Sequence, residues 1–177
     1  MIERTAPAHP HGFDVVLLID EQHDKPALAP QTLKHCCTQA LQQQSLLDLS
    51  QADTVEISIQ SLDMDAMRAL NFEYRKKDSA TNVLSFESGL PLLQELDAPN
   101  LQVLGDLILC PELIAREAYE QDKPVADHWA HLVVHGTLHL CGYDHISDDD
   151  ASLMESLEVQ VLSTCSIPDP YQMHAVK

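Results

Sequence analysis

Alternating apolar and polar positions identify one strand clearly, and short apolar runs indicate three more. In residues 54–60 (TVEISIQ), Val55, Ile57 and Ile59 share one face and polar side chains share the other. This period of two is the pattern of a strand with one buried face. Runs rich in apolar and β-branched residues predict further strands at residues 13–20 (FDVVLLID), 82–86 (NVLSF) and 103–110 (VLGDLILC).

Apolar residues at intervals of three and four positions predict helices between the strands and after the last one. In residues 63–75, Met64, Met67 and Leu70 fall on one side of such a helix. Proline suits a first helical turn, and Ser147 with Asp150 has the spacing of a capping box. The five predicted helices cover residues 31–47, 63–75, 111–120, 124–141 and, approximately, 147–165.

The segments between these elements indicate a single α+β domain. Residues 1–12 contain two prolines and no periodicity, so we expect a disordered tail there. Residues 87–102 contain two prolines, one glycine and three carboxylates, which is typical of a mobile loop. No repeat or linker divides the rest, so we predict that residues 13–177 form one domain, a small mixed β-sheet packed with about five helices.

Charge and composition narrow the class of protein. The net charge at pH 7 is −18, with only ten basic residues, whereas general attraction to nucleic acid requires clustered Lys and Arg. We therefore expect no DNA partner. No apolar run approaches the roughly 20 residues of a membrane-spanning helix, and the first residues lack the apolar stretch of a secretory signal. Five cysteines without a CxxC pair favour reduced thiols, so a cytoplasmic protein without a membrane partner is expected.

Histidines recur at one-turn intervals in the fourth predicted helix and once more just after it. His131, His135 and His139 are four residues apart, so they lie on one face of a helix. Gly142 is expected to end this helix, and the following turn brings in His145. Neutral imidazoles from His135, His139 and His145 can then converge on one metal ion, for which zinc is the first expectation.

The predicted metal site resembles a catalytic site more than a structural one. Three protein ligands leave one coordination position open to water or substrate. Cys141 is a weak candidate for a fourth ligand, because it lies about 200° around the helix from His139. Gly136 stands where zinc peptidases of the H-E-x-x-H type carry their glutamate base, which disfavours that activity. Asp144 and Asp148 are candidate acceptors that could orient an imidazole.

Three of the ten basic residues stand together after the second predicted helix, at Arg75, Lys76 and Lys77. The two lysines could equally belong to a solvated turn. Arg75 differs from them because its planar, always charged guanidinium matches the geometry of a phosphate. One arginine near a metal ion can hold a phosphodiester and stabilise the charge that develops during its cleavage.

Three segments resemble a known family. Residues 131–145 (HLVVHGTLHLCGYDH) match the H-G-x-L-H-L-x-G-Y-D-H signature of the YbeY family, bacterial endoribonucleases and rRNA maturation factors. Residues 70–86 (LNFEYRKKDSATNVLSF) resemble its L-N-x-x-Y-R-x-x-D-x-x-T-[DN]-V-L-S-F segment, and residues 104–112 (LGDLILCPE) its L-G-D-[IV]-x-[IL] strand. The resemblance spans residues 54 to about 165 in the same order. Lys76 departs from it, because glycine is frequent at that position.

The resemblance implies a function that composition and spacing do not. His135, His139 and His145 would hold one zinc ion, Arg75 would be a catalytic or phosphate-binding residue, and His131 would line the same cleft as a proton carrier. With Lys76 and Lys77 beside Arg75 as substrate-binding residues, the enzyme would cut single-stranded RNA. Its process would be maturation of small-subunit (16S) rRNA and ribosome quality control, with the small subunit or its proteins as partners.

Two other functions stay open at this point. The chain could be a metallohydrolase of peptides or small molecules, which a glutamate close to the metal would favour. It could also be a ribosome-docking module whose metal is structural, which a fourth protein ligand would favour.

Overall fold

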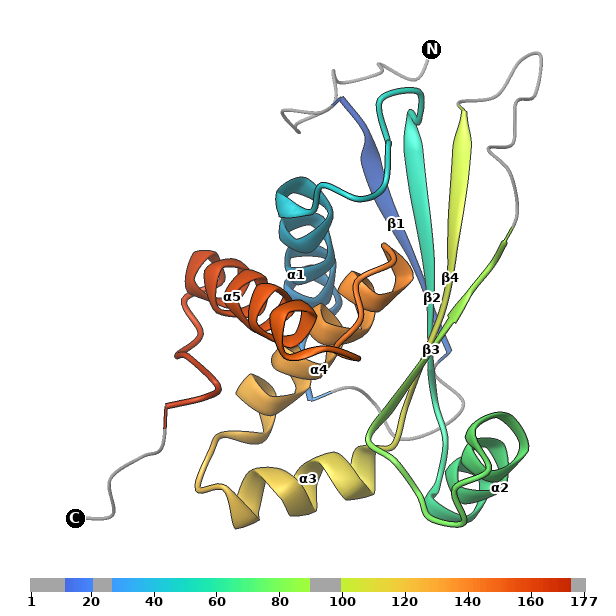
Figure 1. Cartoon of the computed structure of the whole chain (residues 1–177), viewed down its shortest axis with the longest axis vertical. Coiled ribbons are helices and arrows are strands. Elements are labelled where there is room, and N and C mark those ends of the chain that lie inside the picture. The colour runs from blue at the N-terminus through green and yellow to red at the C-terminus, as the bar shows by residue number, and fades with distance from the viewer. Residues whose placement is uncertain (1–11, 21–26, 90–99, 173–177) are drawn as a thin grey trace.

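Four strands form a mixed sheet in the computed structural model, which describes residues 12–20, 27–89 and 100–172 (Figure 1). The strands are β1 (Asp14–Ile19), β2 (Thr54–Ser61), β3 (Val83–Glu87) and β4 (Leu101–Leu109). Their order is β1-β2-β4-β3. Strands β1, β2 and β4 are parallel to one another, and β3 runs antiparallel to β4. All four strands predicted from the sequence are confirmed, and β3 is an edge strand.

The alternation in β2 corresponds to one buried face of the sheet. Val55, Ile57 and Ile59 are at most 1% exposed, whereas Glu56 and Ser58 between them are half-buried. The three apolar side chains join the main core cluster, which also contains residues of the helices on that side. Burying one such side chain contributes roughly 1.5–3 kcal/mol, so this strand anchors the core.

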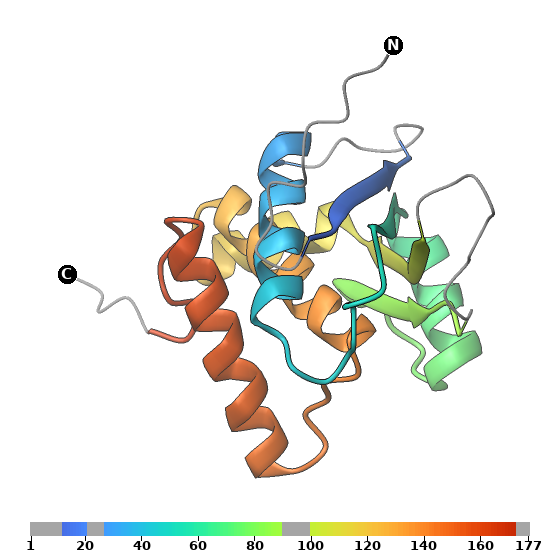
Figure 2. The ribbon, with the colours of Figure 1, turned by 90° about the horizontal axis from the view of Figure 1, so that it is seen from above.

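Helices cover the two faces of the sheet unequally. In Figures 1 and 2, α1, α4 and α5 lie on one side of the sheet, and α2 lies on the other side beside β3. A small separate cluster of Met67, Leu84, Cys110 and Leu113 fills the space under α2. Within the described residues the helices are α1 (Pro30–Gln43), α2 (Met64–Arg75), α3 (Pro111–Glu120), α4 (Val125–Leu140) and α5 (Asp148–Thr164). The predicted α+β fold with about five helices is thus confirmed.

The central helix of the core is α4. Ten of its 16 residues are buried, and Trp129 is the largest fully buried side chain of the described chain. Beyond its first turn, the residues that stay partly exposed are His131, His135 and His139. Their spacing of four leaves one narrow stripe of the helix open to solvent, and that stripe consists of imidazoles.

Element boundaries follow local hydrogen bonds. The Ser147 hydroxyl accepts from the Asp150 backbone N–H, so the predicted cap of α5 is confirmed. The first helix ends at Gln43, four residues before the predicted end. The reason is Gln44, whose side-chain amide donates to the Leu47 carbonyl and accepts from the Leu47 N–H, which closes a turn in place of further helix.

Some predictions fall outside the described residues. Residues 1–11 of the predicted tail and residues 90–99 of the predicted loop 87–102 belong to this group. The ends of that loop are described, and they extend β3 to residue 87 and begin β4 at residue 101. Among the helices described, none has both the length and the apolar composition to cross a membrane.

Candidate metal centre

The structure brings His135, His139 and His145 together. Each offers one ring nitrogen, and the three nitrogens lie within 4.8 Å of one another. His135 and His139 lie on consecutive turns of α4, and their Nε2 atoms are 3.1 Å apart. Two nitrogens on one tetrahedral zinc ion lie about 3.3–3.4 Å apart, given Zn–N bonds of about 2.0–2.1 Å. The spacing of the donor atoms therefore fits a shared metal ion.

Hydrogen bonds on the far side of each ring leave these Nε2 atoms as acceptors. His135 Nδ1 lies 2.8 Å from Glu158 Oε1, and His139 Nδ1 lies 2.8 Å from the Tyr143 carbonyl oxygen. An ionised carboxylate and a carbonyl can only accept, so both Nδ1 atoms must donate. In the neutral rings the two Nε2 lone pairs then face each other, an arrangement that a cation between them satisfies.

Burial keeps His139 in the state that binds a metal. Removal from water, together with the neighbouring His135 ring, lowers the pKa of His139 to about 4. The imidazole is therefore neutral near pH 7, and neutral imidazole is the form that ligates metals.

The turn after α4 is held in place by the opposite side of the core. Gly142 has a φ of +93°, a left-handed conformation that glycine adopts without steric cost. Tyr143 is 5% exposed, and its hydroxyl accepts a hydrogen bond from the Ser45 backbone N–H at the end of α1. This anchor fixes both the Tyr143 carbonyl beneath His139 and the start of the segment that carries His145.

A buried carboxylate from α5 links two of the helical histidines. Glu158 is 1% exposed, and its Oε2 lies 2.7 Å from His131 Nε2 while its Oε1 holds His135. Tyr171 also donates its hydroxyl to Oε2. Burial alone would raise the pKa of Glu158, but the hydrogen bonds from the two histidines outweigh it and lower the pKa to about 2.

His131 lies beside the metal centre without belonging to it. Its ring centroid is 6.3 Å from that of His135. Because its Nε2 is engaged by Glu158, the nitrogen left over is Nδ1, which is buried and has no hydrogen-bond partner within the described residues.

The three predicted substrate-binding residues lie away from the histidines. Arg75 ends α2, Lys76 and Lys77 follow it, and all three are exposed. The preceding Tyr74 packs edge-on against Phe86 of β3, with ring centroids 4.9 Å apart. Between described residues, no hydrogen bond or ion pair joins Arg75 to the histidine cluster.

The edge strand β3 separates the basic cluster from α4. Successive side chains of a strand point to opposite faces. Leu84 is buried with Met67 under α2, whereas Ser85 donates its hydroxyl to the Gly136 carbonyl of α4. The two groups of candidate residues therefore flank the edge strand β3 from its two faces, as Figure 2 shows for the helices that carry them.

Two secondary expectations about the site have different outcomes. Asp144 and Asp148 do not accept from His135 or His139, because Glu158 and the Tyr143 carbonyl take those positions. For the His145 ring their role stays a prediction. Asp144 accepts from the His145 backbone N–H. Cys141 is not a member of the histidine group within the described residues. Its side chain is buried in the core, where burial raises its pKa to about 12, a thiol rather than a thiolate.

Sequence reasoning missed Glu158, which holds two of the helical histidines, and His128, a buried histidine at the start of the same stripe. Glu158 and His128 are both nearly buried. His128 lies one turn before His131 and places its Nε2 2.8 Å from Glu117 Oε2. The spacing of His128 and His131, at i and i+3, was a usable signal for His128. No pattern in α5 singled out Glu158 among its acidic neighbours.

Comparisons with known proteins identify the family of this chain. A model of the family described as Endoribonuclease YbeY matches residues 18–166. Endoribonuclease YbeY of Cellvibrio japonicus (strain Ueda107) is 49% identical over 125 residues, which cover 71% of this chain and 68% of that protein. The protein of the same name from Halorhodospira halophila (strain DSM 244 / SL1) is 51% identical over 117 residues, 66% of this chain and 75% of its own.

Among solved structures, the solution structure of TM1509 from Thermotoga maritima aligns with a TM-score of 0.49 and 22% identity, over 89% of this chain and 99% of that one. The family match over most of the chain and the two relatives at about half identity together show that this chain belongs to the YbeY family of endoribonucleases and is an enzyme of the nuclease class.

Proposed function

We propose that this chain is a zinc-dependent endoribonuclease that cuts single-stranded RNA. The observation that carries the proposal is the convergence of three histidine nitrogens within 4.8 Å, two of them fixed as acceptors by hydrogen bonds behind their rings. Imidazole ligands suit zinc, and three of them leave a position open for substrate. When bound, zinc would supply Lewis-acid polarisation of a phosphoryl oxygen.

The substrate would bind across the edge of the sheet. The helix α2, which ends at Arg75, packs on one face of β3, and α4, which carries His135 and His139, packs on the other. A strand of RNA crossing that edge would meet both groups. In this arrangement Arg75 holds a phosphate by two parallel hydrogen bonds and Lys76 and Lys77 attract the neighbouring ones. His131, beside the metal centre, is the proposed proton carrier.

Ribosomal RNA of the small subunit is the proposed substrate in the cell. The family supports cleavage of RNA, and we extend it to maturation of 16S rRNA and ribosome quality control in the cytoplasm. The net charge of −18 favours a substrate delivered by a ribosomal subunit or an associated protein over free RNA captured from solution.

The two alternative functions receive less support. A structural metal would call for a fourth ligand, and the histidine group contains only three members within the described chain. A peptidase would need a carboxylate base facing the substrate. Glu158 lies behind His135, on Nδ1, and so points away from the side on which the Nε2 atoms converge.

Cleavage of a single-stranded RNA by purified protein tests the proposal. His139→Ala and Arg75→Ala should each reduce the rate by at least about 100-fold, while Arg116→Ala, which removes another exposed arginine, should retain it. A 2′,3′-cyclic phosphate at the product end would identify attack by the 2′-hydroxyl of the RNA itself. Equal cutting by all the variants would mean a contaminating nuclease and would sink the proposal.

A further inference from the structure

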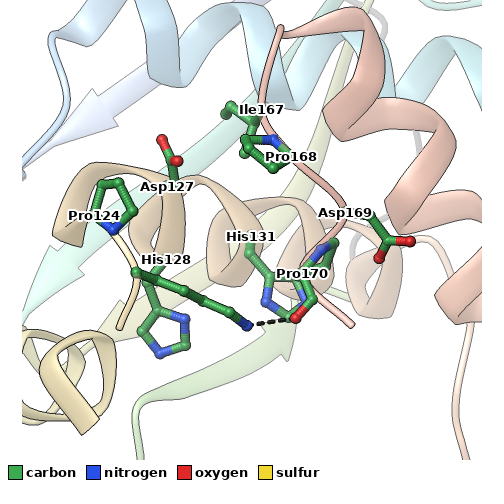
Figure 3. A pocket seen from close by; sticks show the side chains of 9 residues that line it. Pro124, Asp127, His128, His131, Ile167, Pro168, Asp169 and Pro170 are labelled. Atoms are coloured by element: carbon green, nitrogen blue, oxygen red, sulfur yellow. Dashed lines mark hydrogen bonds between the residues drawn. The ribbon is translucent and has the colours of Figure 1, made fainter. Parts of the chain in front are cut away.

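Two different surfaces adjoin the stripe of imidazoles on α4. Its first turns border a cavity of about 260 Å³, which the segment that follows α5 closes on the other side (Figure 3). Asp127 and Asp169 line this cavity, and Lys123 donates from Nζ to the Pro170 carbonyl, the dashed line in Figure 3. Two carboxylates beside an engaged amine disfavour a polyanion, so RNA should leave the histidines in the other direction, towards β3.

On the side of β3, aromatic and basic residues lie together in residues 72–77 (FEYRKK). Two of the chain's eight aromatic residues (three Phe, four Tyr, one Trp) and three of its ten basic residues fall in these six positions. Phe72 is 54% exposed and Tyr74 is 60% exposed. The three cations are exposed as well, and with Glu73 they give the segment a net charge of +2. Exposed aromatic rings beside cations are typical of surfaces that bind single-stranded nucleic acid.

The ring of Tyr74 is oriented by a neighbour and still open to solvent. It packs edge-on against Phe86 of β3, with ring centroids 4.9 Å apart and an angle of 71° between the planes. Phe86 in turn packs against the small core cluster under α2. Because 60% of Tyr74 stays exposed, a flat face of its ring is accessible. A ring that is already oriented loses little conformational entropy when a base stacks on it.

The turn that follows α2 is fixed by two side chains of that helix. Asn71 is 2% exposed and donates from Nδ2 to the Ser79 carbonyl over 2.7 Å. The Arg68 guanidinium makes two hydrogen bonds to the Asp78 carboxylate, 2.7 and 2.9 Å long, which offset the negative charge next to the basic residues. No ion pair within the described chain engages Arg75, so its guanidinium is available to a phosphate.

Strand β3 joins this surface to the candidate metal centre. Phe86 lies beside Tyr74, and the preceding Ser85 donates its hydroxyl to the carbonyl of Gly136, one residue after His135. Adjacent side chains of a strand point to opposite faces, so β3 separates the tyrosine ring from the histidines. A single strand of RNA that crosses β3 with one phosphate at the histidines therefore has a nearby base on the side of Tyr74.

We propose that Tyr74 is a base-binding residue, whose exposed ring stacks on one base of single-stranded RNA while Arg75 contacts a phosphate beside that base. Stacking accepts any base, because each has a π-face. The tyrosine thus adds affinity without selecting a sequence. The course of the RNA across β3 rests on the proposed function, whereas stacking on Tyr74 does not depend on cleavage.

Binding of a 2′-methoxy hexaadenylate to the full-length, zinc-loaded protein provides the test. Fluorescence anisotropy measures the affinity, a gel checks that the RNA stays intact, and one adenine at a time is replaced with an abasic residue. A stacked base contributes a factor of at least about five, so one abasic position should cost the wild type this much affinity. Tyr74→Leu should bind the all-adenine RNA at least about fivefold more weakly. The abasic residue at that position should then cost nothing more.

Two other variants separate stacking from loss of structure. Tyr74→Phe keeps the flat ring and removes only the hydroxyl, so it should bind like the wild type. Tyr119→Leu removes a tyrosine of α3 that is 88% exposed and should leave the affinity unchanged. Stacking involves no ionic contact, so the ratio of affinities between the wild type and Tyr74→Leu should be the same at about 50 and 200 mM salt.

Equal abasic losses in the wild type and in Tyr74→Leu would overturn the proposal, as would a loss in Tyr74→Phe as large as that in Tyr74→Leu. A ratio that shrinks as salt rises would overturn it as well, because a phosphate contact would then be responsible. Wild-type binding that Tyr74→Leu does not weaken would reject the base-binding role alone. Absence of RNA binding by the wild type would reject the proposed function together with it.

Discussion

At the scale of single residues, the candidate metal centre depends on groups that lie behind its histidines and not between them. Glu158 accepts hydrogen bonds from two imidazoles with its two oxygens, 2.7 and 2.8 Å away. This arrangement sets the tautomer of His135 and thereby aims its Nε2 at that of His139. Such outer partners typically contribute 10–100-fold to metal affinity.

Replacing Glu158 with glutamine should therefore weaken zinc binding about 10–100-fold. A glutamine side chain has one acceptor oxygen, so one of the two imidazoles would face an NH₂ donor in place of a carboxylate. Competition with a chromophoric chelator measures the dissociation constant. Glu155→Gln removes an exposed carboxylate from the same helix and should leave the constant unchanged. Equal affinities for both variants would show that Glu158 does not orient the ligand.

Lys76 is a residue in a conformation that suits glycine. It caps α2 with a φ of 58° and a ψ of 27°, and a side chain there costs roughly 1–2 kcal/mol relative to glycine in the left-handed region. The frequency of glycine at this position in the YbeY pattern has its physical reason here. The cost falls on the cluster proposed to bind RNA.

Lys76→Gly should therefore raise the melting temperature by about 2–4 °C, the shift expected for about 1 kcal/mol in a chain of this size. Differential scanning calorimetry provides the measurement. Lys77→Gly is the matched control, because Lys77 is not among the described residues with positive φ. It removes the same charge and should give no gain. A gain of similar size in both variants would point to charge rather than backbone conformation.

At the scale of elements, two close approaches position α4 and the edge strand. A Cβ on Gly105 of β4 would lie 2.0 Å from the Phe86 carbonyl oxygen, and the φ of Gly105 is +144°. A Cβ on Gly136 of α4 would lie 2.8 Å from a Leu107 methyl group and 3.1 Å from Ser85 Oγ. The first contact is with backbone, and the second is with the ends of side chains.

Gly105→Ala should consequently cost several times more stability than Gly136→Ala. We expect about 3 kcal/mol or more for the former, because β3 must separate from β4 or the backbone must strain. For Gly136→Ala we expect a loss of about 1 kcal/mol or less, because crowding of Leu107 is offset by the roughly 1 kcal/mol gain in helix propensity. Urea unfolding of both variants would measure this, and a larger loss for Gly136→Ala would contradict the ranking.

The pattern of side chains along the sequence predicted the helices and strands better than it predicted which side chains contact one another. Period-two alternation located β2, and histidines spaced by four located the two helical members of the candidate metal site, because both signals are local. Glu158 was missed because its partners His131 and His135 lie more than twenty residues away. The early end of α1 was missed because it depends on hydrogen bonds between the Gln44 side chain and the Leu47 backbone. These bonds compete with continued helix, and the helix propensity of the residues does not reveal them.

At the scale of the whole molecule, charge opposes the proposed substrate. The net charge is −18, and of the exposed arginines near the basic cluster, Arg68 is already paired with Asp78 at 2.7 Å. Arg75, Lys76 and Lys77 are thus the local exception in an acidic protein. Attraction of RNA must come from a focused patch, whose field decays within about 10 Å at 0.1 M salt.

Binding of a short single-stranded RNA should therefore be weak and governed by about three phosphate contacts. For single strands the logarithm of affinity falls by about 0.7 per contact for each tenfold rise in salt, so three contacts predict a roughly 20-fold loss between 50 and 200 mM. Fluorescence anisotropy with a 2′-methoxy RNA, checked on a gel for the absence of cleavage, measures the slope. Lys77→Ala should reduce the slope by about 0.7. Lys34→Ala, which removes a lysine of α1 that is paired with Asp14 of β1, should leave the slope unchanged. A slope near zero would mean that RNA is held by base contacts alone, and a partner that supplies the missing positive charge would then no longer be needed.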